Sequence, residues 1–147
     1  MDVEFLTNQE ILQQARKNLE QGPWNYLVGG VESETSMKRN RLAFDKIAFR
    51  PRVLVDVSKI DTSVSLLNYK LRIPVVLAPI GSLQVFAKEG AVASAKAAGD
   101  FGTIHVVSSV TEPSLEKIAQ TTDADKLYQL YIHGDWEWVK DKIERIK

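Results

Sequence analysis

The chain has 147 residues, the size of one ordinary domain, and 44% of them are hydrophobic, which is enough to bury a core. Nineteen basic residues balance nineteen acidic ones, so no net field favours nucleic acid or an anionic membrane surface. Cysteine is absent, which excludes disulfides, thiolate metal sites and a cysteine nucleophile. No apolar run reaches the roughly 18 residues of a membrane span, and the polar N-terminus does not resemble a leader, so we expect a cytoplasmic protein.

Three amphipathic helices are predicted in the first third of the chain. Thr7 and Glu10 have the spacing of a capping box, and apolar residues at helical spacing follow them. Gly22-Pro23 is expected to end this helix and to start a shorter one, because proline suits a first helical turn. Gly29-Gly30 stops the second helix. Residues 32–46 form the third.

An extended segment and a small hairpin are predicted next. Residues 53–57 are mostly β-branched or aliphatic and follow a proline break, so we expect them to run extended. Residues 63–66 and 69–73 have the composition of two short strands, and Leu67-Asn68 would form the turn between them.

From Pro74 onward the pattern changes to an alternation of strands and helices. The first strand is an uninterrupted apolar run, which predicts burial on both faces, and a Pro/Gly break follows it. Repeated βα units imply parallel strands, arranged either as an open sheet or as a βα barrel. The predicted strands are residues 74–78, 103–108 and 127–132, and the helices after them are residues 88–98, 112–119 and 135–143.

Polar residues gather where these strands end. No glycine-rich dinucleotide fingerprint or phosphate-binding loop follows any strand, which disfavours a nucleotide-binding open sheet. Ser108 closes the second strand, while Gln129 and Tyr131 are two apart on the third, so their side chains should leave one face and the neighbouring aliphatic residues should face the helices. The alternative, to which we give equal weight, is that these polar side chains only form hydrogen bonds with their neighbours in the fold. His105 falls within the second predicted strand and His133 at a strand-to-helix turn; two unclustered histidines make a poor metal site, and we interpret both as structural.

Several ordered motifs of the chain resemble the FMN-dependent 2-hydroxy acid dehydrogenase family, which includes glycolate oxidase and lactate oxidase. The resemblance implies an α/β fold, the N-terminal part of a (β/α)₈ TIM barrel. Residues 1–147 would be an incomplete domain, with helices and hairpin in residues 1–73 and the first three βα units in residues 74–147. The motifs are residues 26–30, 40–44, 49–57, 78–81, 102–104 with 108–109, and 129–131.

The resemblance also implies a site for FMN and for the substrate. Main chain at the end of the first strand would lie beside the flavin ring, where a free N–H could reach flavin N5. Tyr26 would bind the substrate carboxylate, and Tyr131 would be the catalytic residue that contacts the substrate hydroxyl and stabilises developing charge. No metal ligand is implied. The implied cofactor-binding residues are Pro79, Ile80, Gly81, Ser108 and Gln129.

The implied reaction is oxidation of a small L-2-hydroxy acid of the lactate or glycolate type to the 2-oxo acid. Val110 stands where glycolate oxidases carry an aromatic residue, so the particular acid and the electron acceptor stay open. The family's histidine base, arginines and lysine follow later strands, so the isolated chain is expected to be inactive. The alternatives are a non-catalytic half-barrel that assembles with a separate C-terminal half or with itself, and another FMN barrel such as a flavin-dependent isomerase. A full-length form is expected to be a homo-oligomer.

Overall fold

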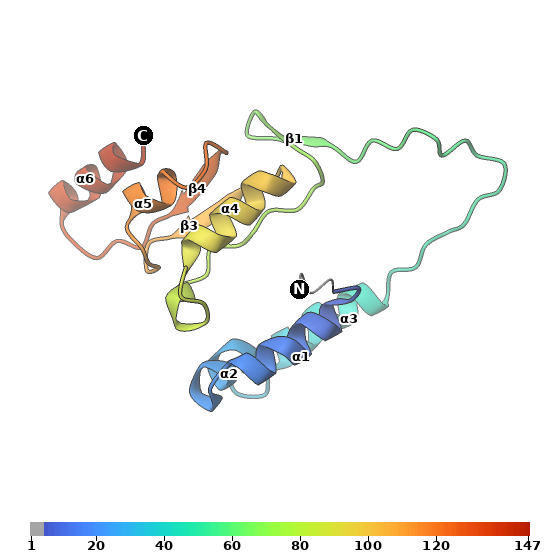
Figure 1. Ribbon diagram of the computed structural model, residues 1–147, viewed down its shortest axis with the longest axis horizontal. Helices are drawn as coiled ribbons and strands as arrows, with labels where there is room; N and C mark the ends of the chain where they lie inside the picture. Colours follow the sequence, from blue (N-terminus) through green and yellow to red (C-terminus); the bar gives the residue numbers. More distant parts are fainter. Residues whose placement is uncertain (1–4) are drawn as a thin grey trace. The chain divides into compact units, whose positions relative to one another are not determined.

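The computed structural model describes residues 5–147 and forms two compact units, Met1–Lys59 and Ile60–Lys147 (Figure 1). The first unit contains three helices, and the second contains a hairpin followed by parallel strands and helices. Within the described residues, no helix is both long and apolar enough to cross a membrane.

The first helix, α1 (Asn8–Asn18), begins at the predicted capping box. The N–H of Glu10 donates to Thr7 Oγ1 at 3.3 Å, and the N–H of Thr7 donates to Glu10 Oε2 at 3.2 Å. These two bonds satisfy backbone donors that no earlier turn can satisfy, so the start of α1 is fixed by local sequence.

The second and third helices, α2 (Gln21–Val28) and α3 (Thr35–Asp45), differ from prediction at their first residues. Helix α2 begins at Gln21, before Gly22-Pro23, rather than at Pro23. Pro23 then lies in the first turn, where its missing N–H would have no helical acceptor in any case, so the helix tolerates it. Helix α3 begins later than expected, because Glu34 is in the left-handed region at φ 57°. Its C-terminal end agrees with the prediction to one residue.

The prediction that residues 53–57 run extended is wrong at Leu54. Leu54 has φ 57°, which breaks an extended backbone, and none of these residues belongs to a strand. The predicted hairpin is confirmed: β1 (Val64–Leu66) pairs antiparallel with β2 (Tyr69–Leu71). Leu67 and Asn68 both have positive φ, as a two-residue turn of the I′ type requires.

The parallel pairing of the second and third predicted strands is confirmed. Strand β3 (His105–Ser108) pairs with β4 (Lys126–Gln129), and the register places Ser108 opposite Gln129. Residues 74–78 form no full strand, but Leu77 makes an isolated parallel bridge to His105. The Leu77 N–H donates to the Ile104 carbonyl at 2.9 Å, so this segment is the neighbour of β3 on its other side.

The prediction that residues 74–78 are buried on both faces is wrong, since Val75 is 51% exposed. Pro74 and Pro79 lack an N–H, and the Val75 N–H donates to the Ile73 carbonyl at 2.8 Å instead of to a strand. Little of the segment is therefore available for a ladder.

Three helices alternate with the strands of the second unit: α4 (Ala91–Phe101), α5 (Leu115–Ala119) and α6 (Trp136–Ile146). A short 3₁₀ helix, η1 (Leu83–Val85), precedes α4 and was not predicted. Helix α5 begins at Leu115 rather than at the predicted residue 112, because Ser114 is the cap and accepts from the Lys117 N–H. Asp135 caps α6 in the same way, accepting from Trp138.

The core of the second unit lies between the strands and the helices. Buried Ala91, Ala95, Val107 and Ile118 form one cluster, and Tyr128 packs against it. Val107 and Tyr128 are opposite each other in the register, so this face of the sheet is the helix-covered face. Side chains that alternate with them, including those of Ser108 and Gln129, point to the other face.

Candidate functional site

The ends of β3 and β4 bring together two of the predicted cofactor residues. The Ser108 hydroxyl donates to Gln129 Oε1 at 3.3 Å and accepts from the Val110 N–H at 3.3 Å. A hydroxyl has two acceptor lone pairs, so Ser108 keeps one lone pair for a ligand. Gln129 keeps its NH₂ group, because none of the hydrogen bonds among the described residues involves it. The pair can therefore both donate to and accept from a bound heterocycle.

The loop after residues 74–78 places Gly81 beside this pair. A Cβ at Gly81 would lie 3.9 Å from Ser108 Oγ and 2.8 Å from Val110 Cγ2, so a larger residue there would force the Val110 side chain to shift. The Ser82 N–H donates to the Val110 carbonyl at 3.0 Å and holds the loops together. We call Gly81, Ser108 and Gln129 the strand-end cluster.

Pro79 and Ile80 lie in the same loop and are exposed. Among the described residues, no acceptor pairs with the N–H of Ile80 or Gly81. Pro79 has no N–H, so these two groups are the donors that the loop offers to a ligand. The N–H groups and the cluster's amide and hydroxyl suit a planar ligand that both accepts and donates hydrogen bonds, as a flavin ring does.

Tyr131 lies just beyond the strand-end cluster, because β4 ends at Gln129. Its N–H donates to Ser109 Oγ at 3.1 Å, and the Ser109 N–H donates to the Gln129 carbonyl at 3.0 Å. The side chain is 55% exposed, and its hydroxyl makes no hydrogen bond within residues 5–147. The expectation that the alternate aliphatic residues face the helices is wrong for Ile132, which is exposed because the strand has already ended.

Tyr26 lies on α2, in the first unit, with 69% of its surface exposed. The strand-end cluster belongs to the second unit. The predicted role of Tyr26 at the substrate carboxylate therefore stays a prediction.

The two histidines lie in different surroundings. His105 is buried on the helix-covered face, beside Lys126 in the register, and its Nδ1 has no hydrogen-bond partner among the described residues. Burial lowers the pKa of His105, and the Lys126 charge lowers it further. His133 is exposed and follows Tyr131. In the part of the chain that the structure describes, no three acidic or histidine side chains gather in a way that could hold a metal ion.

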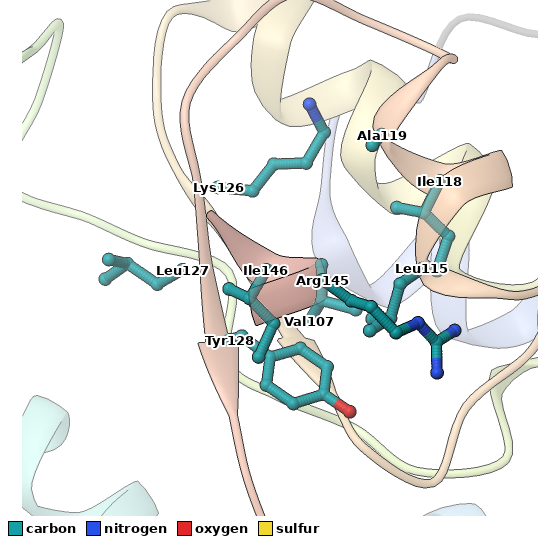
Figure 2. A pocket seen from close by; sticks show the side chains of 9 residues that line it. All are labelled: Val107, Leu115, Ile118, Ala119, Lys126, Leu127, Tyr128, Arg145 and Ile146. Atoms are coloured by element: carbon teal, nitrogen blue, oxygen red, sulfur yellow. The ribbon is translucent and has the colours of Figure 1, made fainter. Parts of the chain in front are cut away.

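An apolar pocket lies on the opposite face of the sheet from the strand-end cluster (Figure 2). Val107 and Tyr128 form its floor, α5 contributes Leu115 and Ile118, and Arg145 of α6 lies at its side. Figure 2 shows Leu127 pointing away from these side chains. Burial raises the pKa of Tyr128, and the nearby Arg145 charge offsets this only in part.

The sequence analysis named Ser109 as part of a motif and Val110 by its position in the family, but it did not predict the contacts that either residue makes at the site. Ser109 fixes the backbone of Tyr131, and Val110 joins Ser108 to the loop of Gly81. The sequence feature that could have identified them is their position directly after a predicted strand, because residues there lie at the sheet edge where ligands bind.

Main-chain donors, a serine and a glutamine lie together at the carboxyl ends of neighbouring parallel βα units, which is where α/β enzymes bind their ligands. Residues 15–147 match the family model described as FMN-dependent dehydrogenase, and the chain belongs to this family.

Similar proteins agree with this assignment. The chain is 37% identical over 131 residues to glycolate oxidase 1 of Oryza sativa subsp. indica, covering 89% of this chain and 36% of that protein. It is 40% identical over 119 residues to a peroxisomal (S)-2-hydroxy-acid oxidase of the same rice, covering 81% of this chain and 32% of the relative. The chain thus spans about a third of the length of these relatives.

Solved structures resemble the fold closely. The crystal structure of a mandelate oxidase matches with a TM-score of 0.89 at 27% identity, over 97% of this chain and 41% of that one. A lactate oxidase of Pediococcus acidilactici matches with a TM-score of 0.90 over 99% of this chain and 41% of that one. Its 24% identity supports the fold alone.

Proposed function

We propose that this chain supplies the first three βα units of a (β/α)₈ barrel that oxidises a small L-2-hydroxy acid, of the lactate or glycolate type, to the 2-oxo acid with FMN. The family match supports the cofactor. The observation that carries the proposal is the convergence of Gly81, Ser108 and Gln129 at the carboxyl ends of neighbouring βα units, where barrel enzymes bind their ligands.

The residues of the strand-end cluster would hold the flavin ring. When bound, FMN supplies the hydride acceptor of the reaction. The NH₂ group of Gln129 would donate to a ring carbonyl, and the remaining lone pair of Ser108 would accept from a ring N–H. The N–H groups of Ile80 and Gly81 would donate to the edge of the ring that the loop faces, which fixes the ring's orientation.

Tyr131 and Tyr26 would serve the substrate. The exposed hydroxyl of Tyr131 would donate to the substrate oxygen on which charge develops, and a donor held in place before reaction stabilises that charge. Tyr26 would donate to the substrate carboxylate. A tyrosine hydroxyl donates to the carboxylate without a positive charge of its own, so cationic side chains from other parts of the protein would balance the carboxylate's charge.

The isolated 147-residue chain is proposed to be inactive. Among the described residues, the strand-end cluster itself has hydrogen-bonding groups but contains no histidine: His105 lies on the opposite face, and His133 lies beyond the cluster with its ring packed against Tyr131. Two parallel strands and one bridge do not form a closed barrel, and the outer edge of β4 has no partner strand within residues 5–147.

A half-barrel that pairs with a separate C-terminal half, or with itself, is the second candidate. The unpaired edge of β4 favours it. Size-exclusion chromatography of the purified chain distinguishes the two, because a discrete dimer supports the pairing module and aggregation supports an incomplete domain. We also propose a cytoplasmic location for the chain.

The test of the main proposal is a chimera in which this chain replaces the matching N-terminal portion of rice glycolate oxidase 1. We expect the chimera to retain FMN and to oxidise glycolate or lactate. Gln129→Leu should weaken FMN binding about tenfold, because the amide's donor and acceptor are lost. Gln120→Leu, at an exposed glutamine after α5, is the matched control and should leave FMN binding unchanged.

Flavin absorbance of the purified proteins measures the outcome. A chimera that folds but binds no flavin would contradict the proposal for the strand-end cluster. Stoichiometric flavin and turnover in the isolated chain would contradict the claim that it is inactive alone.

A further inference from the structure

Three aromatic rings after β4 contact one another in turn, the last of them on α6, and we call them the aromatic row: Tyr131, His133 and Trp138. The ring centroids of Tyr131 and His133 are 5.9 Å apart with an interplanar angle of 66°. Those of His133 and Trp138 are 6.1 Å apart at 86°. Both contacts have the edge-to-face geometry that aromatic rings prefer, so the row is a connected set of rings.

The Trp138 end of the row is fixed to the backbone. A Cβ on Gly134 would lie 2.7 Å from Cβ and Cγ of Trp138, so the indole packs directly on the main chain at Gly134. The backbone N–H of Trp138 donates to Asp135 Oδ1 at 2.9 Å, which fixes the start of this side chain. The Lys142 ammonium lies 5.3 Å from the indole centroid, within the range of a cation–π contact.

The Tyr131 end of the row is held at its backbone but is open at its ring. Ser109 accepts from the Tyr131 N–H, which fixes where the side chain begins. More than half of the Tyr131 surface is exposed, so packing leaves much freedom to the torsions that place its hydroxyl. The edge contact with His133 restricts this freedom.

We propose that His133 is a positioning residue for Tyr131. Its ring transmits the fixed position of Trp138 to the Tyr131 ring, and so holds the Tyr131 hydroxyl at the mouth of the strand-end cluster. This inference rests on the proposed function only where it assigns the Tyr131 hydroxyl to the substrate. The ring packing itself is a property of this chain without cofactor.

Fluorine NMR of the 147-residue chain labelled with meta-fluorotyrosine tests the packing directly. The chain has four tyrosines, and replacing each by phenylalanine assigns its signal. In His133→Ala the Tyr131 signal should move toward that of free fluorotyrosine and become narrower, because the ring gains freedom. His133→Phe keeps a ring at this position and should retain most of the native shift. Trp138→Leu should act in the same direction as His133→Ala but less strongly.

Trp136→Phe is the matched control. Trp136 is also at the start of α6, but its recorded ring contact is with Lys140, away from the aromatic row. It should leave the Tyr131 signal unchanged. A Tyr131 signal that is the same in His133→Ala as in the native chain would overturn the proposal. So would a signal in His133→Phe that matches His133→Ala.

The chimera with rice glycolate oxidase 1 separates this inference from the proposed function. His133→Ala should lower kcat/KM for the 2-hydroxy acid by up to about tenfold, the loss expected for one aromatic pair, with FMN content unchanged. His133→Phe should restore most of it. An unchanged kcat/KM in His133→Ala overturns the positioning role while the proposed function stands. Absence of FMN from the chimera without substitutions contradicts the proposed function, and the NMR result alone then tests whether His133 restricts the Tyr131 ring.

Discussion

The two units of the chain differ in what holds their helices. None of the residues in α1, α2 and α3 is buried, and Ile11 of α1 is 49% exposed. In the second unit α4 and α5 cover the sheet, and Ile118 is 1% exposed within a core cluster. Isoleucine side chains should therefore contribute much less to the free energy of unfolding in the first unit than in the second.

This difference separates local from long-range stabilisation. Helix α1 is specified by its capping box and by pairs four residues apart, such as Gln14 with Asn18 at 3.1 Å. Strands β3 and β4 pair residues 21 positions apart, as Ser108 and Gln129 are, and their parallel pairing depends on the crossover through α5. The first unit should thus lose structure turn by turn, and the second unit cooperatively.

The largest difference is expected from matched isoleucine truncations. Ile118→Ala should destabilise the second unit by about 2–5 kcal/mol, because it removes buried methyl groups and leaves a cavity. Ile11→Ala should change stability by less than about 1 kcal/mol, since the side chain is half exposed and alanine favours a helix. Urea unfolding in a Trp24→Phe background, in which the remaining tryptophans lie on α6, reports the second unit. Equal losses in both variants would show that the contrast in burial does not govern stability.

A matched pair of glycines should give the next largest difference. Gly90 has φ 55°, and a Cβ there would lie 2.3 Å from the Glu112 carbonyl oxygen, so Gly90→Ala should cost about 1–3 kcal/mol. Gly22 lies in α2 with no atom within 4 Å of a built Cβ, so Gly22→Ala should stabilise the helix by about 0.5–1 kcal/mol. Thermal melts followed by circular dichroism measure both changes. Opposite signs are the expected result, and a harmless Gly90→Ala would contradict the assigned backbone conformation.

The sequence predicted best the elements that depend on nearby residues. The capping box at Thr7, the hairpin turn at Leu67-Asn68 and the helix α6 are all found, because each depends on spacing within a few residues. The parallel pairing of β3 with β4 is also found, since alternating strands and helices allow few other arrangements.

The prediction failed where the environment decides the outcome. The apolar run at residues 74–78 was expected to be buried, but burial requires neighbours on both sides, and only Leu77 bridges to β3. Leu54 adopts a positive φ, and no sequence pattern predicts this conformation for a leucine.

The candidate site was predicted only in part. Spacing placed Ser108 and Gln129 at strand ends, and the structure joins them by a hydrogen bond. The contact between Gly81 and Val110 links loops 29 residues apart, and no periodicity contains that information. His133 was interpreted as structural because the two histidines do not cluster, and its contact with the Tyr131 ring was not predicted.

Matched helix caps should give a smaller contrast between the units. Thr7→Ala removes a capping box and should cost about 1 kcal/mol, seen as lost helix signal in far-ultraviolet circular dichroism, because no core holds α1 when its cap is gone. Ser114→Ala removes a single cap bond at α5, where buried Ile118 keeps the helix in place. It should therefore lower the free energy of unfolding of the second unit without a visible loss of helix in the native state. Loss of helix signal in both variants would mean that the core does not hold α5.

The smallest expected effect is the pH dependence that His105 gives to the second unit. Burial, and secondarily the Lys126 charge, lower the pKa of His105 from its ordinary value of 6.5. The unfolded chain then binds the proton more readily than the folded one, so the stability contributed by the neutral ring is complete above that ordinary value and falls as the pH drops below it. Urea unfolding of the second unit at several pH values on either side of 6.5 measures this dependence.

Two variants show whether His105 causes it. His105→Gln cannot gain the proton, so its stability should vary less with pH in this range than that of the native chain. Lys126→Gln removes the secondary cause and should make the dependence shallower without abolishing it, because burial acts first. Glu116 and other carboxyls with lowered pKa act below the range in which His105 titrates, so they do not obscure the measurement. An identical pH dependence in the native chain and in His105→Gln would show that the buried imidazole carries no such linkage, and that the second unit is insensitive to the one histidine within its core.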